Sequence, residues 1–335
     1  MGKQPVPRHS LSPGCFGKQC VTAARSAEES NVPTNPLSKL LDRRKPTRSD
    51  VEQALAQLAQ LSEQHPDLVE LAATHAALLR VSFRDTPPVP SVSLELQQAA
   101  TKLQGGVPLL RGEPLAFDGA WLRERYVQLC EALADVAGSS NTGSATRSGA
   151  QALRQAVKRG MLDIQALATD VVAGDPYTVA QRAEQLELDS QLAATVLRWT
   201  LLPILEQVAK QVEQARHNLP WDKGYCPVCG AWPILAERRG LEQTLLLRCG
   251  LCAAEWPIDN IFCPFCSTRT HFDIGYLYDE SQEANQRVMT CERCHCYYKS
   301  VRTLAALTTP QLFVMDLATF HLDLIALERT YGPPG

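Results

Sequence analysis

The residues of this chain that are best suited to chemistry are four Cys-x-x-Cys pairs. They hold eight of the twelve cysteines and are Cys226/Cys229, Cys249/Cys252, Cys263/Cys266 and Cys291/Cys294. Thiolates are soft ligands, and two thiolates that are separated by two residues can face one metal ion from a single turn. Each pair would supply half of a tetrahedral shell. We therefore expect the four pairs to hold two metal ions.

The spacing between the pairs supports this interpretation. Nineteen residues separate Cys229 from Cys249, which is typical of paired Cys-x-x-Cys metal sites. The 24 residues between Cys266 and Cys291 can form a hairpin. The motif Cys-Pro-Val-Cys-Gly at 226–230 also recurs as Cys-Pro-Phe-Cys-Ser in the third pair, which indicates a duplication. Rubredoxin knuckles and zinc ribbons share this pattern, so the residues leave open iron or zinc, and sequential or crossed pairing.

Other uses of the cysteines fit less well. Disulfides are typical of oxidising compartments, and the first 45 residues lack the apolar stretch of a secretory signal. Thioredoxin-type redox pairs occur singly rather than four in a row. Next to the fourth pair, His295 and Cys296 can be a hydrogen-bond donor and a spare thiol, which we prefer, or they can make this site exchangeable.

The charge and hydropathy of the chain indicate which classes of partner it can bind. The net charge is −3, and residues 221–300 hold eight Lys and Arg against ten Asp and Glu. Nucleic-acid binding normally needs a basic excess, so we expect a protein partner and no nucleic acid. Because no run of 18 apolar residues occurs, we expect no membrane insertion. Because no secretory signal is evident, we expect a cytoplasmic location.

The chain is expected to have an α+β multidomain fold. An all-α N-terminal helical domain is followed by two small rubredoxin-like or zinc-ribbon modules and a C-terminal helix. The expected parts are a flexible tail at 1–46, the helical domain at 47–220, the first module at 221–262, the second module at 263–303, and the C-terminal helix and tail at 304–335.

Several elements can be placed within these parts. Helical spacing predicts one helix over 151–173 after a loop at 138–149, and another over 189–217 that Pro203 should kink or divide. Strands are expected at 244–248, 255–258, 274–278 and 297–302. The helical domain shows no paired carboxylates, nucleophile elbow or phosphate-binding loop, so we expect no enzymatic activity.

The cysteine block resembles the FdhE family of formate dehydrogenase accessory proteins. The resemblance covers roughly residues 35–331. It depends on the segments Cys226-Pro227-Val228-Cys229-Gly230-Ala231-Trp232-Pro233 and Leu247-Arg248-Cys249-Gly250-Leu251-Cys252, on Glu255-Trp256, and on the two later pairs with Tyr298-Lys299. One departure is His295-Cys296, where relatives tend to have Gly and a small polar residue. This departure leaves open whether the fourth knuckle keeps a closed geometry.

The resemblance implies a cytoplasmic maturation factor, or chaperone, that formate dehydrogenase needs for activity. It implies that the eight paired cysteines bind two metal ions in rubredoxin-like sites, with iron favoured and zinc as the other option. It also implies contact with the catalytic subunit of a respiratory formate dehydrogenase. Alternative functions are an iron-based electron-transfer protein of the rubredoxin type and a zinc-ribbon nucleic-acid-binding protein. Whether the chain forms a homo-oligomer stays open.

Overall fold

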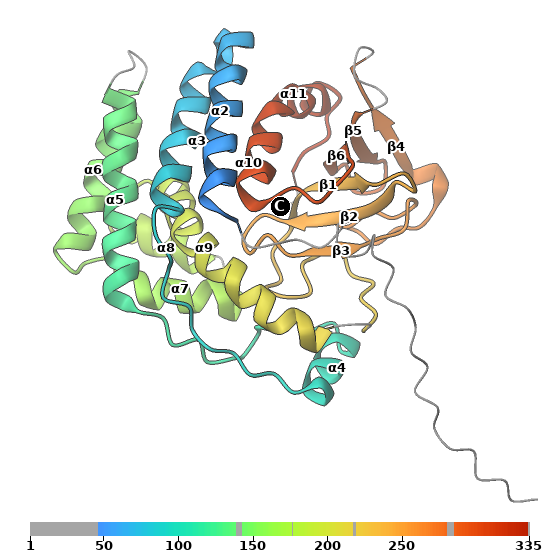
Figure 1. Cartoon of the computed structure of the whole chain (residues 1–335), viewed down its shortest axis with the longest axis horizontal. Helices are drawn as coiled ribbons and strands as arrows, with labels where there is room; N and C mark the ends of the chain where they lie inside the picture. Colours follow the sequence, from blue (N-terminus) through green and yellow to red (C-terminus); the bar gives the residue numbers. More distant parts are fainter. Residues whose placement is uncertain (1–45, 139–142, 176, 217–218, 280–284, 334–335) are drawn as a thin grey trace, which may run out of the picture. The chain divides into compact units, whose positions relative to one another are not determined.

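The computed structural model describes residues 46–138, 143–175, 177–216, 219–279 and 285–333. The tail expected at 1–46 lies outside the described residues except for Pro46. Everything described belongs to one compact unit. Figure 1 shows helices from the first half of this unit beside a sheet from the second half. The predicted fold class, α+β with four-cysteine modules after a helical region, is confirmed.

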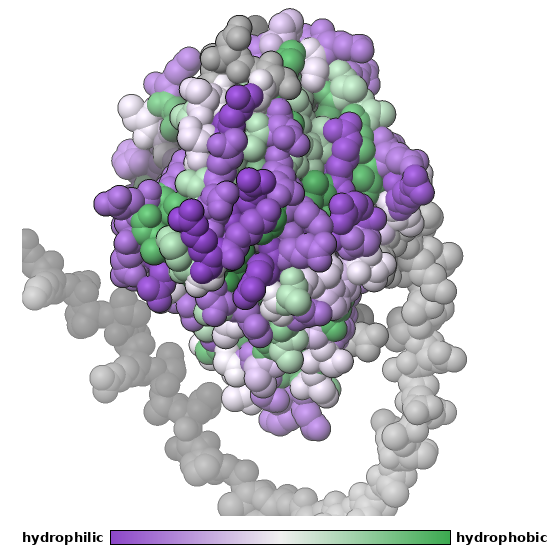
Figure 2. Space-filling view, turned by 90° about the vertical axis from the view of Figure 1, so that its left-hand side faces the viewer, coloured by the Kyte–Doolittle hydropathy of each residue, from purple (hydrophilic) through white to green (hydrophobic). Residues whose placement is uncertain are grey.

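Helix α9 is the element around which the other helices pack. It spans Ser190–Arg216, and its buried side chains include Val196, Leu201 and Leu205. The helices that contact it directly are α3 (Val69–Ser82), α4 (Leu96–Gln104), α5 (Gly119–Gly138), α6 (Ser144–Lys158), α7 (Ile164–Ala173) and α8 (Tyr177–Gln185). Helix α2 (Arg48–Gln64) packs on α3. On the side where α5 and α6 lie, Figure 2 shows mainly hydrophilic side chains, as expected for helices with one solvent-facing side.

Pro203 does not divide α9, contrary to one of the two outcomes expected. A proline within a helix lacks the N–H that would bond to the carbonyl four residues earlier, which here belongs to Trp199. The Ser82 hydroxyl, from α3, donates a hydrogen bond to this Trp199 oxygen at 3.0 Å. The neighbouring helix therefore satisfies the acceptor that the proline leaves open, and α9 continues to Arg216.

The predicted helix over 151–173 and the loop before it were wrong in detail. The structure has two helices in place of the single predicted one. The first, α6, begins at Ser144, inside the predicted loop, and ends at Lys158. Gly160 then adopts a left-handed φ of 72°, which favours glycine and stops the helix. Asp163 begins α7 by accepting hydrogen bonds from the backbone N–H groups of Gln165 and Ala166.

By length and composition, α9 could cross a membrane, as could the C-terminal helices α10 (Thr309–Ala318) and α11 (Phe320–Glu328) taken together. In α9, 72% of the most apolar 18-residue stretch is buried inside the protein. Its apolar surface is therefore already covered by the other helices, which is typical of a core helix.

The two modules share one six-stranded sheet in the order β3-β2-β1-β6-β5-β4. Its strands are β1 (Pro233–Arg239), β2 (Thr244–Cys249), β3 (Glu255–Pro257), β4 (Ile274–Leu277), β5 (Gln286–Cys291) and β6 (Tyr297–Thr303). Strands β1 and β6 pair in parallel and join the modules, whereas all other pairs are antiparallel. The predicted strands correspond to β2, β3, β4 and β6; β1 and β5 were not predicted.

The C-terminal segment is two helices rather than one. Helices α10 and α11 are bent by 46° at Thr319. They cover one face of the sheet, where the Lys299 ammonium contacts Asp316 at 2.7 Å and Asp323 at 2.8 Å. Because side chains alternate along a strand, Lys299 and Val301 point to this face. Ser300 therefore points to the opposite face.

Candidate metal centres

The eight paired cysteines lie in two groups of four. The first centre consists of Cys226, Cys229, Cys249 and Cys252, and the second centre of Cys263, Cys266, Cys291 and Cys294. The pairing is therefore sequential, the first pair with the second and the third with the fourth. In each group the four sulfur atoms lie within 4.8 Å of one another.

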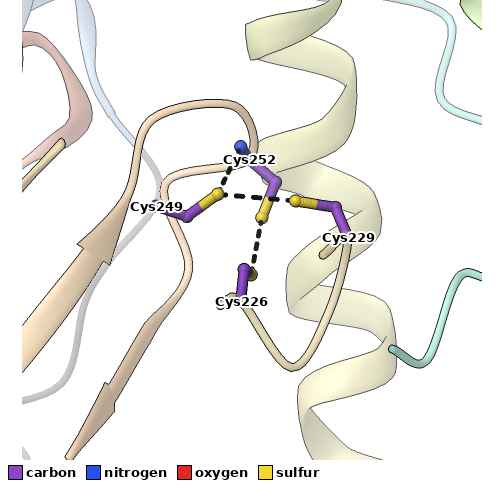
Figure 3. Close-up of side chains that lie close together, drawn as sticks. All are labelled: Cys226, Cys229, Cys249 and Cys252. Atoms are coloured by element: carbon purple, nitrogen blue, oxygen red, sulfur yellow. Dashed lines mark hydrogen bonds between the residues drawn. The ribbon is translucent and has the colours of Figure 1, made fainter. Parts of the chain in front are cut away.

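The sulfur positions in each group fit the tetrahedral coordination of one metal ion. In the first centre Sγ of Cys229 lies 3.4 Å from Sγ of Cys249, and in the second Cys263 and Cys294 are 3.6 Å apart. Four sulfurs arranged tetrahedrally around one ion at the usual metal–sulfur distance lie about 3.8 Å from one another, whereas the sulfur–sulfur bond of a disulfide is about 2.05 Å long. Figure 3 shows the four sulfurs of the first centre directed toward one another from two facing loops. Each group can thus hold one ion with four sulfur ligands.

All four Cys-x-x-Cys turns share one backbone conformation. The residue four positions after the first cysteine of each pair is left-handed, with φ of 84° at Gly230, 56° at Ala253, 60° at Ser267 and 54° at His295. In three of the turns its N–H donates a hydrogen bond to the carbonyl oxygen of the first cysteine, at 2.9 Å from Gly230 to Cys226, from Ser267 to Cys263 and from His295 to Cys291. The fourth knuckle therefore keeps the closed geometry of the others despite its histidine.

Backbone N–H groups within these turns point at sulfur. Val228 N lies 3.4 Å from Sγ of Cys226, and Leu251 N lies 3.3 Å from Sγ of Cys249. Such contacts stabilise negative charge on sulfur, which a thiolate ligand carries. The short turn is thus arranged for thiolates rather than for neutral thiols.

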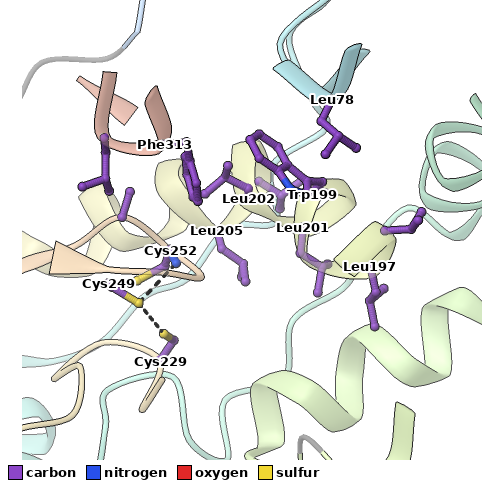
Figure 4. Packing of buried hydrophobic residues seen from close by; sticks show 14 of the residues in the cluster. Leu78, Leu197, Trp199, Leu201, Leu202, Leu205, Cys229, Cys249, Cys252 and Phe313 are labelled. Atoms are coloured by element: carbon purple, nitrogen blue, oxygen red, sulfur yellow. Dashed lines mark hydrogen bonds between the residues drawn. The ribbon is translucent and has the colours of Figure 1, made fainter. Parts of the chain in front are cut away.

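The two centres differ in burial. The cysteines of the first centre are at most 4% exposed and belong to the main hydrophobic core. Figure 4 shows Cys249 and Cys252 beside Leu205 of α9, in the same packed region. In the second centre, Cys263 and Cys291 are buried, whereas Cys266 and Cys294 are partly exposed. The first centre is therefore an interior site and the second opens toward solvent.

The helical region holds the first centre in place. Arg198 of α9 donates a hydrogen bond from Nε to the Gly250 carbonyl oxygen at 2.8 Å. The backbone N–H groups of Leu109 and Leu110 donate to the carbonyls of Pro227 and Val228, at 2.8 and 2.9 Å. No pattern in the sequence pointed to these contacts, because each joins segments that are far apart along the chain.

The thiols of the first centre influence one another strongly. Burial raises the pKa of Cys252 well above its usual value. Burial also acts to raise the pKa of Cys249, but hydrogen bonds with the other three cysteines outweigh it and hold that pKa well below its usual value. Gathering four ionisable sulfurs in the interior is costly unless a cation holds them as thiolates.

His295 and Cys296 lie outside the second group of four sulfurs. Sγ of Cys296 contacts the Cys294 carbonyl oxygen at 3.6 Å, and the His295 ring lies 6.2 Å from that of Tyr331. This placement favours the preferred interpretation of a spare thiol beside a full set of four.

Comparisons with known proteins identify relatives across most of the chain. No family model matches it. The protein FdhE homologue of Stutzerimonas stutzeri is 27% identical over 282 residues, which cover 83% of this chain and 85% of the relative. The FdhE homologue of Pseudomonas aeruginosa is 28% identical, with 82% and 84% covered. The resemblance to the FdhE family is confirmed.

The fold agrees with a solved FdhE structure. The crystal structure of the FdhE protein from Pseudomonas aeruginosa matches with a TM-score of 0.56 and 22% sequence identity. The match covers 87% of this chain and 95% of that FdhE chain. At this identity the match shows that the two proteins share a fold.

Proposed function

We propose that this chain is a non-catalytic accessory protein for the maturation of formate dehydrogenase, which binds the catalytic subunit of that enzyme in the cytoplasm. The proposal depends on one observation above all. Eight cysteines form two four-sulfur groups on a helical body, in a chain that is similar to FdhE proteins over more than four-fifths of its length.

The metal requirement follows from the donor set. Each group supplies four sulfurs at tetrahedral spacing, which suits iron and zinc alike. The family resemblance favours iron. Four protein sulfurs fill the coordination shell and leave no position for a substrate, so the ions would stabilise the modules rather than perform catalysis. The first centre would tie the sheet to the helices, because its knuckles contact both.

The partner would be recognised by the folded, metal-loaded protein. We expect a tagged chain to co-purify with the formate dehydrogenase catalytic subunit from cells that lack the untagged copy. The variants C249S and C263S, each of which removes one proposed ligand, should weaken this association and lower formate dehydrogenase activity. The matched control is C296S, because Cys296 lies beside the second centre but outside its four sulfurs. Normal enzyme activity in a deletion strain, without any association, would contradict the proposal.

A second candidate function is electron transfer through iron. The partial exposure of Cys266 and Cys294 favours it, because an electron partner could approach the second centre closely. If the ion is iron, this centre supplies one-electron chemistry. Reversible reduction of the purified protein, coupled to turnover of a redox partner, would support this function. Stable zinc occupancy in cells would count against it.

A further inference from the structure

We propose that three arginines on one face of the sheet, Arg238, Arg287 and Arg302, form a binding site for the phosphate group of a small ligand. We call these residues, together with Ser300 between them, the arginine cluster. The site lies on the face of the sheet opposite α10 and α11, and it involves none of the paired cysteines. It is therefore a separate function from the proposed metal binding.

Strand register brings the cluster together. Arg238 on β1 and Arg302 on β6 are direct partners across the parallel pair. Arg287 on β5 is the direct partner of Ser300, two residues before Arg302 on β6. Neighbouring strands are about 4.8 Å apart, and partner side chains point to the same face. Three guanidinium groups thus share a small area above the centre of the sheet, where β1, β6 and β5 run side by side (Figure 1).

Polar atoms in this area are buried without hydrogen-bond partners. They are Nε and Nη2 of Arg238 and the hydroxyl oxygen of Ser300, a residue that is 0% exposed. A buried donor without an acceptor costs free energy, and a charged donor costs more than a neutral one. Two such residues on the same face, one strand apart, indicate that an acceptor from outside the chain completes the site.

The charges of Arg238 and Arg302, which are direct partners across β1 and β6, also favour an anion. Burial lowers the pKa of Arg238, and the nearby charges of Arg287 and Arg302 lower it further. Like charges directly opposite each other on neighbouring strands destabilise a sheet. Arg287 is also held by the Tyr276 ring, whose centroid lies 4.7 Å from its guanidinium carbon. An oxyanion between the arginines would turn this repulsion into attraction.

The ligand chemistry follows from the donors. Guanidinium groups bind phosphate with paired N–H donors, and several of them suit a doubly charged tetrahedral oxyanion better than a single carboxylate. The surrounding module is slightly acidic, with ten Asp and Glu against eight Lys and Arg over residues 221–300. A long polyanion would be repelled by these acids, so we infer a small phosphorylated molecule or free phosphate.

The test uses titration calorimetry on the full metal-loaded chain at fixed ionic strength. The probes are inorganic phosphate, ADP and a single-stranded oligonucleotide. The variants are R238Q, which removes the buried donors, and S300A. The control R159Q makes the same charge change at an exposed arginine of the helical region. Thermal unfolding and metal content of every variant show whether it is folded.

Saturable binding of phosphate or ADP should weaken at least about tenfold in R238Q and remain unchanged in R159Q, because charge-assisted hydrogen bonds carry the affinity. Tighter binding of ADP would identify a nucleotide as the source of the phosphate, and equal binding would identify free phosphate. The unliganded R238Q protein should be at least as thermally stable as the original, since it loses like-charge repulsion. Three results would overturn the proposal: no saturable binding of phosphate or ADP, equal weakening of binding in R159Q, or binding of the oligonucleotide alone. All of these outcomes are independent of formate dehydrogenase.

Discussion

Arg198 of α9 donates a hydrogen bond from Nε to the carbonyl oxygen of Gly250, at 2.8 Å, and so joins the helical core to the second knuckle of the first centre. Its guanidinium carbon also lies 5.0 Å from the centroid of the Phe313 ring of α10. Burial lowers the pKa of Arg198, while Asp316 and Cys249 act in the opposite direction. One side chain thus links the longest helix, a proposed metal centre and the C-terminal helices.

Replacing Arg198 with methionine should weaken this link. The variant R198M keeps much of the side-chain volume but loses a charged donor in the interior, so we expect a loss of about 2 kcal/mol in the free energy of unfolding. Metal release from the first centre should also become faster. Urea unfolding and timed metal release measure the two effects. The exposed Arg182 on α8 provides the control R182M, and equal behaviour of the two variants would contradict the role of Arg198.

Gly224, two residues before the first knuckle, is a second contact point, because it lies against the third knuckle. A Cβ atom there would overlap the backbone of Pro264, including its carbonyl oxygen. Since backbone cannot move aside cheaply, G224A should cost about 2 kcal/mol in stability and lower metal retention in the second centre. Gly332 has open space around its Cβ position, so G332A is the control. Thermal unfolding with metal analysis checks the prediction, and an unchanged G224A protein would refute it.

The two centres should lose their ions in a fixed order. Cys266 and Cys294 are partly exposed, whereas all four cysteines of the first centre are buried. A chelator with a thiol reagent should therefore remove one ion quickly, from the second centre, and the other slowly. The variant C294S should abolish the fast phase and C249S the slow phase. Simultaneous release of both ions, or loss from the first centre first, would contradict the burial argument.

Stability should fall in mildly acidic solution because of His75. Burial is the main cause that lowers the pKa of this histidine below 6.5; its Nδ1 lies 2.9 Å from the Leu71 carbonyl oxygen, a contact that acts in the opposite direction. Below pH 6.5 the unfolded chain binds a proton that the folded chain does not, so stability is fully present above pH 6.5 and decreases as the pH falls toward the folded-state pKa.

The variant H75Q lacks this titrating group and should lose less stability between pH 7.5 and the lowered pKa. Urea midpoints at several pH values in this window measure the difference. His65 is exposed, so H65Q should behave like the original protein. Parallel pH dependence of H75Q and the original chain would show that His75 does not contribute.

The ligand pairs could be predicted because their geometry is local. Two cysteines in one turn, such as Cys226 and Cys229, face the same point wherever the turn lies in the fold. The pairing between turns is set by the β1–β2 and β4–β5 hairpins, and the sequence left it open. The left-handed conformation could be expected only at Gly230, because Ala253 and Ser267 seldom adopt it and the modest preference of histidine at His295 is too weak a signal alone.

Strand β1 was missed because charged residues occupy its buried positions. Glu237 is 0% exposed and Arg239 is 4% exposed, so the apolar alternation expected of a strand is absent. The two residues are satisfied by each other, with 3.1 Å between Arg239 Nη2 and Glu237 Oε1, and by Thr303 of β6, whose hydroxyl lies 2.9 Å from Glu237. Such long-range compensation cannot be read from a single segment.

Metal content measured on protein purified without oxygen tests the central claim most directly. We predict two ions per chain in the original protein and in C296S, iron if the family resemblance holds for the metal, and one ion per chain in C249S and in C263S. A metal-free chain that is fully folded, with its paired cysteines joined as disulfides, would contradict it.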